Sequence, residues 1–120
     1  MTPVWIALAG AAGAVSRFVL DALIRRRTPD SFPWATMVVN VSGSLVLGVL
    51  TGLVLYRGAS SDLTLILGTG FCGGYTTFST ASFETVRLAE RGEWVRAAVN
   101  ALGTVVLTVS AAAVGLVLVR

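Results

Sequence analysis

The sequence predicts an all-α membrane protein with four transmembrane helices, and two observations support this fold class. First, the 120 residues are 55% hydrophobic and only 12% charged, whereas soluble domains carry about 25% charged residues. Second, the apolar residues form four long segments, at about 3–24, 34–56, 62–89 and 94–119, and a helix of about 20 apolar residues spans a bilayer. We therefore expect a single domain, residues 1–120, in a lipid bilayer.

A cleaved signal peptide is the alternative interpretation of the first segment, residues 3–24. It is disfavoured because no basic residue precedes the apolar run and three further segments follow it. Near the end of this segment, Arg17 and Asp21 are four residues apart, so they share one helix face and can pair. Two interpretations stay open for Arg17: an ion pair at the membrane interface, or a cation at a pore mouth that attracts anions.

Asn40 is the one strongly polar residue inside the second segment, which carries no charge between Asp30 and Arg57. Its amide costs free energy in lipid unless it finds a hydrogen-bond partner. Trp34 and Tyr56 lie at the two ends of the segment, where interfacial aromatic residues are expected. Asn40 is therefore predicted to lie inside the membrane, either in a hydrogen bond between helices or as a donor that lines a pore.

The third segment is the most unusual, because residues 68–84 are rich in glycine and hydroxyl residues. Such a stretch at membrane depth is tolerated only where it is buried in protein or lines a cavity. Its middle, residues 73–77, reads Gly-Gly-Tyr-Thr-Thr and joins weak helix formers, so we expect the helix to break there. A break frees backbone carbonyls, and such carbonyls from two facing copies would coordinate a hard monovalent cation such as Na⁺.

Polar residues continue beyond the expected break and recur in the fourth segment. Hydroxyl residues between positions 76 and 82 are weak evidence, because they often bond to their own helix. Phe78 is more specific, since the positive edge of its ring can face a small anion without trapping it. Asn100, Thr104 and Thr108 recur every four residues and form one polar line. This line predicts either packing bonds between helices or a polar path.

Composition excludes several function classes. The chain has no histidine and a single cysteine, Cys72, so most side-chain ligand sets for a metal ion are excluded and no internal disulfide can form. No nucleophile–base set is present, and we do not expect an enzyme. The nine arginines and six acids give a net charge of +3, but these arginines flank the apolar segments, as membrane topology favours. The basic face that nucleic acid requires is missing.

Motifs in three segments resemble one known family. The second segment carries Thr-x3-Asn-x2-Gly-Ser-x3-Gly at residues 36–48. The third carries Gly-Phe-Cys-Gly-Gly-Tyr-Thr-Thr-Phe-Ser-Thr at residues 70–80, followed by Glu84. The first contributes residues 13–18, which end in Arg-Phe. Together these motifs extend over nearly the whole chain and resemble the Fluc (CrcB) fluoride-channel family.

The resemblance implies a fluoride-selective channel of the plasma membrane, which exports fluoride from the cytoplasm by passive flux and lowers fluoride toxicity. It also implies an antiparallel, dual-topology-type dimer with two pores and one structural Na⁺ on its axis. The pore residues that the family pattern implies are Arg17, Asn40, Phe78, Ser79, Thr80, Glu84 and Thr104. The backbone carbonyls that it implies for the Na⁺ are those of Gly73 and Thr76.

Ala81 departs from the family pattern, which has a second phenylalanine three residues after Phe78. Phe83 cannot replace it, because two residues along a helix correspond to a rotation of about 200°. Arginines are also unevenly distributed. The loops after the first and third segments lie on one side with Arg25, Arg26, Arg27, Arg87, Arg91 and Arg96, whereas the other side has Arg57 and Arg120.

This asymmetry predicts cytoplasmic loops and external termini, and therefore one orientation of the chain. Our hypothesis is that a paralogous subunit of opposite orientation completes a heterodimer, rather than a second copy completing a homodimer. Two other functions remain as alternatives. Ala81 leaves open a non-conducting scaffold or regulatory subunit of such a channel. A small multidrug-resistance-type cation exchanger needs a membrane-buried carboxylate in its first helix, but the only acid here is Asp21, close to Arg17.

Overall fold

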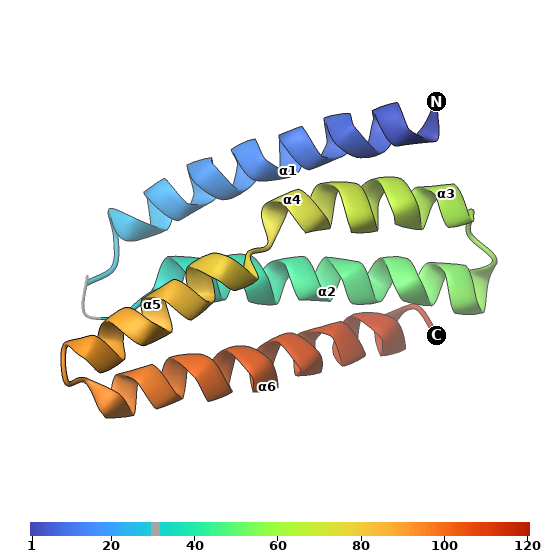
Figure 1. Cartoon of the computed structure of the whole chain (residues 1–120). Helices are drawn as coiled ribbons and strands as arrows, with labels where there is room; N and C mark the ends of the chain where they lie inside the picture. The colour runs from blue at the N-terminus through green and yellow to red at the C-terminus, as the bar shows by residue number, and fades with distance from the viewer. Residues whose placement is uncertain (30–31) are drawn as a thin grey trace.

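The protein is all-helical in the computed structural model, which describes residues 1–29 and 32–120. Three helices are long and apolar enough to cross a membrane: α1 (Thr2–Arg25), α2 (Trp34–Arg57) and α6 (Trp94–Leu118). Most of the buried residues belong to α2, which lies between α1 and α6 (Figure 1). Many large apolar side chains of α1 and α6 are exposed, as expected for helices that face lipid or a second subunit.

The remaining predicted span, residues 62–89, consists of two helical parts. The first part comprises α3 (Ser61–Leu63), the π-helical segment η1 (Thr64–Cys72) and α4 (Gly73–Tyr75), and the second is α5 (Phe78–Glu90). Thr76 and Thr77 separate the two parts with extended backbone, at φ/ψ of −83°/159° and −149°/117°. Figure 1 shows α5 leaving the interruption in a different direction from α4.

The interruption lies slightly later in the chain than the sequence suggested. Gly73 keeps helical backbone angles, and the amide of Thr76 still donates to the carbonyl of Cys72 at 2.8 Å. The two residues that leave the helix are both threonines, whose branched side chains fit extended backbone better than glycine does. Gly74 is needed for a different reason: a Cβ atom there would collide with the backbone carbonyl of Gly10 in α1.

The connections place most of the charged residues at one end of the bundle. In Figure 1, the α1–α2 connection and the α5–α6 turn lie at the same end, and both termini lie at the opposite end with the α2–α3 connection. The chain therefore runs along the bundle four times. Arg26 and Arg27 lie at the first end, with Arg91 of the α5–α6 turn, and Arg57 and Arg120 lie at the other.

Glycine residues allow α2 and α6 to pack closely. A Cβ atom at Gly48 of α2 would collide with the carbonyl of Ala112 in α6, and one at Gly115 of α6 would collide with the carbonyl of Leu45 in α2. Small residues at such contacts let helix backbones approach each other, which favours association of helices in lipid. The two helices therefore form a rigid pair against which the interrupted segment packs.

We expect Gly48→Ala to lower the free energy of unfolding by about 1–3 kcal/mol, because the added methyl group overpacks this contact. Gly103→Ala is the matched control, since the nearest atom to a Cβ there is Cε of Met37 at 3.5 Å. The control should be neutral or stabilising by up to about 1 kcal/mol. Both values can be measured by SDS-induced unfolding in detergent, followed by circular dichroism. Equal stability of the two variants would contradict the close α2–α6 approach.

Candidate functional site

Asn40 binds both backbone groups of Thr77 at the interruption. Its Nδ2 donates to the Thr77 carbonyl at 3.0 Å, and the Thr77 amide donates to its Oδ1 at 2.8 Å. Asn40 is buried, with 7% of its surface exposed. The side-chain oxygen of Asn40 thus replaces the helical acceptor that the Thr77 amide loses, which is necessary because lipid offers no partners to a free backbone group.

Thr77 also begins the helix that follows. Its Oγ1 accepts a hydrogen bond from the amide of Thr80 at 3.1 Å, the usual arrangement of an N-cap threonine. The same hydroxyl lies 3.3 Å from Oγ of Ser79. On the other side of the interruption, Oγ1 of Thr76 donates to the Cys72 carbonyl at 2.8 Å. Side chains therefore hold the start of α5 in a defined position relative to α2.

A groove of about 390 Å³ runs along the interruption, and we call it the break groove. It is formed by residues of α2, η1, α4, α5 and α6, together with the two extended threonines. It contains five of the residues that the family pattern singled out: Asn40, Gly73, Thr76, Phe78 and Thr104. The structure thus brings residues from three of the four predicted membrane segments, the second, third and fourth, to one surface.

The other predicted pore residues line different pockets, or none. Arg17 and Thr80 line a smaller pocket of about 220 Å³, which we call the Arg17 pocket. Glu84 lines a pocket of about 380 Å³ that also includes Thr80, which we call the Glu84 pocket. Thr77 is shared between the break groove and the Arg17 pocket. Ser79 is exposed beside these pockets without lining one of them. Thr77 and Thr80 therefore connect three neighbouring pockets along the start of α5.

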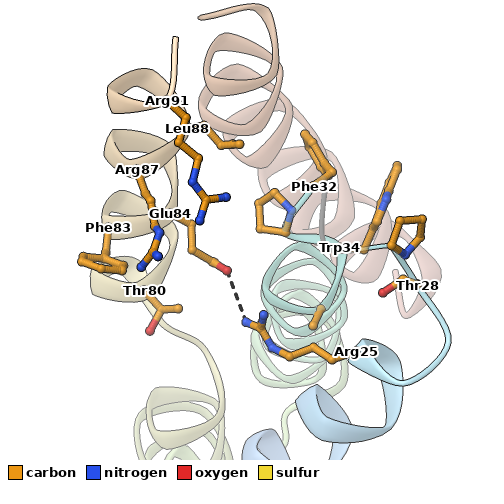
Figure 2. Close-up of a pocket in the computed structure, with 13 residues that line it drawn as sticks. Arg25, Thr28, Phe32, Trp34, Thr80, Phe83, Glu84, Arg87, Leu88 and Arg91 are labelled. Atoms are coloured by element: carbon orange, nitrogen blue, oxygen red, sulfur yellow. Dashed lines mark hydrogen bonds and ion pairs between the residues drawn. The ribbon is translucent and has the colours of Figure 1, made fainter. Parts of the chain in front are cut away.

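Phe78 is the most exposed large side chain of the break groove, with 87% of its surface exposed. Ala81 lines the same groove, so its methyl group occupies the position that the family pattern gives to a second aromatic ring. Phe83 lines the Glu84 pocket instead, and Figure 2 shows it there beside Arg87 and Glu84. Within this chain, the break groove therefore has one aromatic ring.

Asp21 pairs with Arg25 rather than with Arg17. Nε of Arg25 lies 2.8 Å from Oδ2 of Asp21, and its Nη2 lies 3.2 Å from Oε2 of Glu84. Both arginines are four residues from Asp21, but an acid on the N-terminal side of its basic partner is the better arrangement on a helix. Arg17 has no ion-pair partner among the described residues, so the pore-mouth interpretation of Arg17 is not opposed by a bound carboxylate.

The polar line of α6 has two different roles. Nδ2 of Asn100 donates to Oγ1 of Thr85 in α5 at 2.7 Å, a packing bond between helices. Oγ1 of Thr108 donates to the carbonyl of Thr104 within α6 at 2.6 Å. Thr104 itself lines the break groove together with Thr108. Asn100 therefore fixes α5 on α6, and Thr104 and Thr108 present polar atoms to the groove.

Backbone oxygens at the interruption are the atoms to which the predicted Na⁺ would bind. The described part of the chain contains no group of three or more His, Cys, Asp or Glu residues that could bind a metal ion. The carbonyl of Gly73 would accept a hydrogen bond from the Thr77 amide in a continuous helix, but that amide donates to Asn40. Gly73 is also exposed, with open space around the position of a Cβ atom. Its carbonyl is therefore suited to an external ligand.

Sequence reasoning missed two residues that organise the site. Thr77 was treated only as part of the weak helical stretch, yet it binds Asn40 and caps α5. A threonine directly before an apolar residue that begins a helical pattern, here Phe78, is the usual signal of an N-cap. Arg25 links α1 to α5 through Glu84; its spacing of four residues signalled the pair with Asp21, but nothing local signalled the link to Glu84.

Comparisons with known proteins show the family of this chain. The family model described as "CrcB-like protein, Camphor Resistance (CrcB)" matches residues 4–116. A protein of Leifsonia xyli subsp. xyli named "Fluoride-specific ion channel FluC 1" is 50% identical, over 97% of this chain and 87% of that protein. A protein of Cutibacterium acnes named "Fluoride-specific ion channel FluC 2" is 48% identical, over 98% of this chain and 97% of that protein. By family model and by sequence identity, this membrane protein belongs to the CrcB family.

Proposed function

We propose that this chain is a subunit of a fluoride-selective channel that lets fluoride leave the cytoplasm by passive flux across the plasma membrane. The observation that carries the proposal is the identity of 50% with a protein named as a fluoride-specific ion channel, over 97% of the chain. The break groove supports it, because it gathers Asn40, Thr77 and Thr104 at an interrupted helix, and polar residues at such an interruption in a membrane are tolerated only where they are buried in protein or line a cavity. An enzymatic role has no support in the family.

The groove offers donors of moderate strength, as an anion pathway requires. Fluoride must exchange its water for hydroxyl, amide or ring-edge donors, and only weak binding lets it leave again. Thr104 and the ring of Phe78 meet at the break groove, whereas the hydroxyl of Thr108 donates within α6. Thr80 and Glu84 continue the polar surface toward the basic end of the bundle. Arg17 would attract the anion to this surface by its charge.

Half of the pathway would come from a second subunit. Phe78, Ser79 and Gly73 are exposed in the single chain, although they belong to the most polar and most distinctive part of the sequence. An antiparallel dimer would bury them and place two break grooves next to each other. In that arrangement, the carbonyls of Gly73 and Thr76 of both subunits would bind one Na⁺ at the dimer axis. The cation would offset the repulsion between the four carbonyl oxygens.

The second subunit is proposed to be a paralogous chain of opposite orientation. Six arginines lie at one end of the membrane segments and two at the other, a difference that favours one orientation over the other during insertion. The single aromatic ring of the break groove supports the same conclusion, since a partner with two rings would supply what Ala81 does not. A non-conducting scaffold role for this chain remains the second candidate, on the same observation at Ala81.

Fluoride efflux from liposomes tests the proposal directly. The protein is reconstituted into vesicles loaded with potassium fluoride, valinomycin is added to release the counter-ion, and a fluoride electrode records the efflux. Efflux with the paralogous chain and not without it would support a heterodimer. Efflux from the purified chain alone would contradict the heterodimer but not the channel. The scaffold candidate predicts that every pore substitution in this chain leaves the efflux of the paired complex unchanged.

Phe78→Ile should lower the efflux of the conducting complex by about tenfold, because an aromatic contact contributes about 0.5–1.5 kcal/mol and 1.36 kcal/mol corresponds to a factor of ten in rate. Phe83→Ile is the matched control. Phe83 is exposed on the same helix, but it lines the Glu84 pocket and not the break groove. The electrode assay compares both variants at equal protein density. Equal efflux of Phe78→Ile and the control would remove the Phe78 ring from the pathway.

A further inference from the structure

Three arginine side chains line the Glu84 pocket, at the basic end of the bundle (Figure 2). Arg25 comes from the end of α1, and Arg87 and Arg91 lie one turn apart on and after the end of α5. Arg25 is engaged by Asp21 and Glu84. Among the described residues, Arg87 and Arg91 make no ion pair. Two guanidinium groups therefore point into or over a pocket of about 380 Å³ without a carboxylate of their own.

The rest of the pocket wall combines aromatic rings with hydroxyl groups. Phe32 and Trp34 stack as a tilted pair with ring centroids 4.7 Å apart, and both line the pocket. Thr28 and Thr80 contribute hydroxyl groups to the wall. Trp34 is the first residue of the membrane-spanning helix α2, so the pocket lies at the level where interfacial aromatic residues meet lipid headgroups.

Glu84 supplies a second, independent indication of a ligand. Its Oε2 binds Arg25, but its Oε1 is buried and has no hydrogen-bond partner among the described residues. Buried carboxylate oxygens are normally satisfied. An unpartnered acceptor beside unpaired guanidinium groups suits a molecule that carries both an anionic group and a hydrogen-bond donor. A phosphate ester with a hydroxyl or ammonium group has this combination.

We propose that the Glu84 pocket binds a phosphate group at the membrane surface, either the headgroup of an anionic phospholipid or free phosphate. The planar guanidinium groups of Arg87 and Arg91 bind two oxygens of one phosphate in the bidentate geometry that arginine favours. Oε1 of Glu84 accepts a hydrogen bond from the donor on the same ligand. The proposal does not depend on fluoride conduction, because its readout is binding.

Tryptophan quenching tests the proposal in vesicles. Trp5→Phe together with Trp94→Phe leaves Trp34, which lines the pocket, as the only tryptophan. Its fluorescence is measured in phosphatidylcholine vesicles that contain increasing fractions of brominated phosphatidylglycerol, which gives the preference for the anionic lipid next to Trp34.

Arg87→Gln with Arg91→Gln should lower this preference about tenfold, because each substitution removes charge-assisted hydrogen bonds to a phosphate held in the pocket. The matched control is Arg26→Gln with Arg27→Gln, which removes the same charge from the same end of the molecule. Arg26 and Arg27 are exposed and do not line the pocket. The control should change the preference less than about twofold, because diffuse surface charge is screened by salt.

A second arm separates the two sources of phosphate. In a neutral detergent, inorganic phosphate and a short-chain phosphatidylglycerol are each titrated while thermal unfolding is recorded. Stabilisation by the lipid alone assigns the pocket to a headgroup, and stabilisation by both assigns it to phosphate in general; either result supports the proposal if Arg87→Gln with Arg91→Gln abolishes it. An equal loss of lipid preference in the pocket variant and the control variant would overturn the proposal, as would stabilisation by neither ligand.

Discussion

Asn40→Asp should lower fluoride efflux of the conducting complex by more than about 100-fold. The substitution places a negative charge in the break groove, where repulsion between it and a fluoride ion about 4 Å away costs about 4 kcal/mol at an effective dielectric constant of 20. It also removes the Nδ2 donor from the Thr77 carbonyl and leaves two oxygens facing each other at the present distance of 3.0 Å. Both effects act on the same few atoms at the interruption.

Asn40→Ala separates the two effects, because it removes both hydrogen bonds to Thr77 without adding a charge. We expect Asn40→Ala to reduce efflux less than Asn40→Asp, and to lower thermal stability because the buried backbone groups of Thr77 lose their partners. Liposome efflux and thermal unfolding in detergent measure the two quantities. Wild-type efflux of Asn40→Asp in a folded protein would remove Asn40 from the anion pathway.

Ala81→Phe has the largest expected gain of function. In the purified chain without a partner, we expect it to raise fluoride efflux above the wild-type level by about tenfold, the rate equivalent of an aromatic contact at the upper end of its usual range. The break groove that Ala81 lines has a volume of about 390 Å³ and opens to the outside, so a ring can enter without overpacking the helices. Electrode recordings from liposomes provide the measurement.

Ser82→Phe is the control for Ala81→Phe, since it adds the same ring to the next residue of α5, about 100° around the helix. Ser82 lines none of the three pockets described above. The control should leave the efflux of the chain unchanged. If Ala81→Phe does nothing, even with the paralogous subunit present, the missing ring is not what limits this chain, and the argument for a partner would rest on the arginine distribution alone.

The helical class was predictable from the sequence because it follows from local properties. Four apolar stretches of helix length and a charged fraction of 12% leave few alternatives to a helical membrane protein. The place of the interruption was less predictable. Weak helix formers at residues 73–77 indicated the region, but Asn40 of α2 decides which backbone amide leaves the helix. A contact over 37 positions in sequence has no local signal.

The sequence predicted only part of the arrangement of the candidate site residues. The family pattern singled out residues that meet at one groove, among them Asn40, Phe78 and Thr104. The sequence could not tell that Arg17 and Glu84 line separate pockets, because their placement depends on how α5 turns away after the interruption. The sequence also did not decide whether Asp21 pairs with Arg17 or with Arg25, because both arginines are four residues away. Only the helix preference for an acid on the N-terminal side of its basic partner favours the observed pair with Arg25.

The most direct test of the central claim is an ion-flux measurement on the complex that this chain forms in its own cell. The complex is purified through a tag on this chain, so that any second subunit is retained, and is reconstituted into liposomes loaded with fluoride or with chloride. We predict rapid efflux of fluoride, retention of chloride, and loss of the fluoride efflux with Asn40→Asp. No fluoride efflux, or equal efflux of both anions, would contradict the assignment of this chain to a fluoride-selective channel.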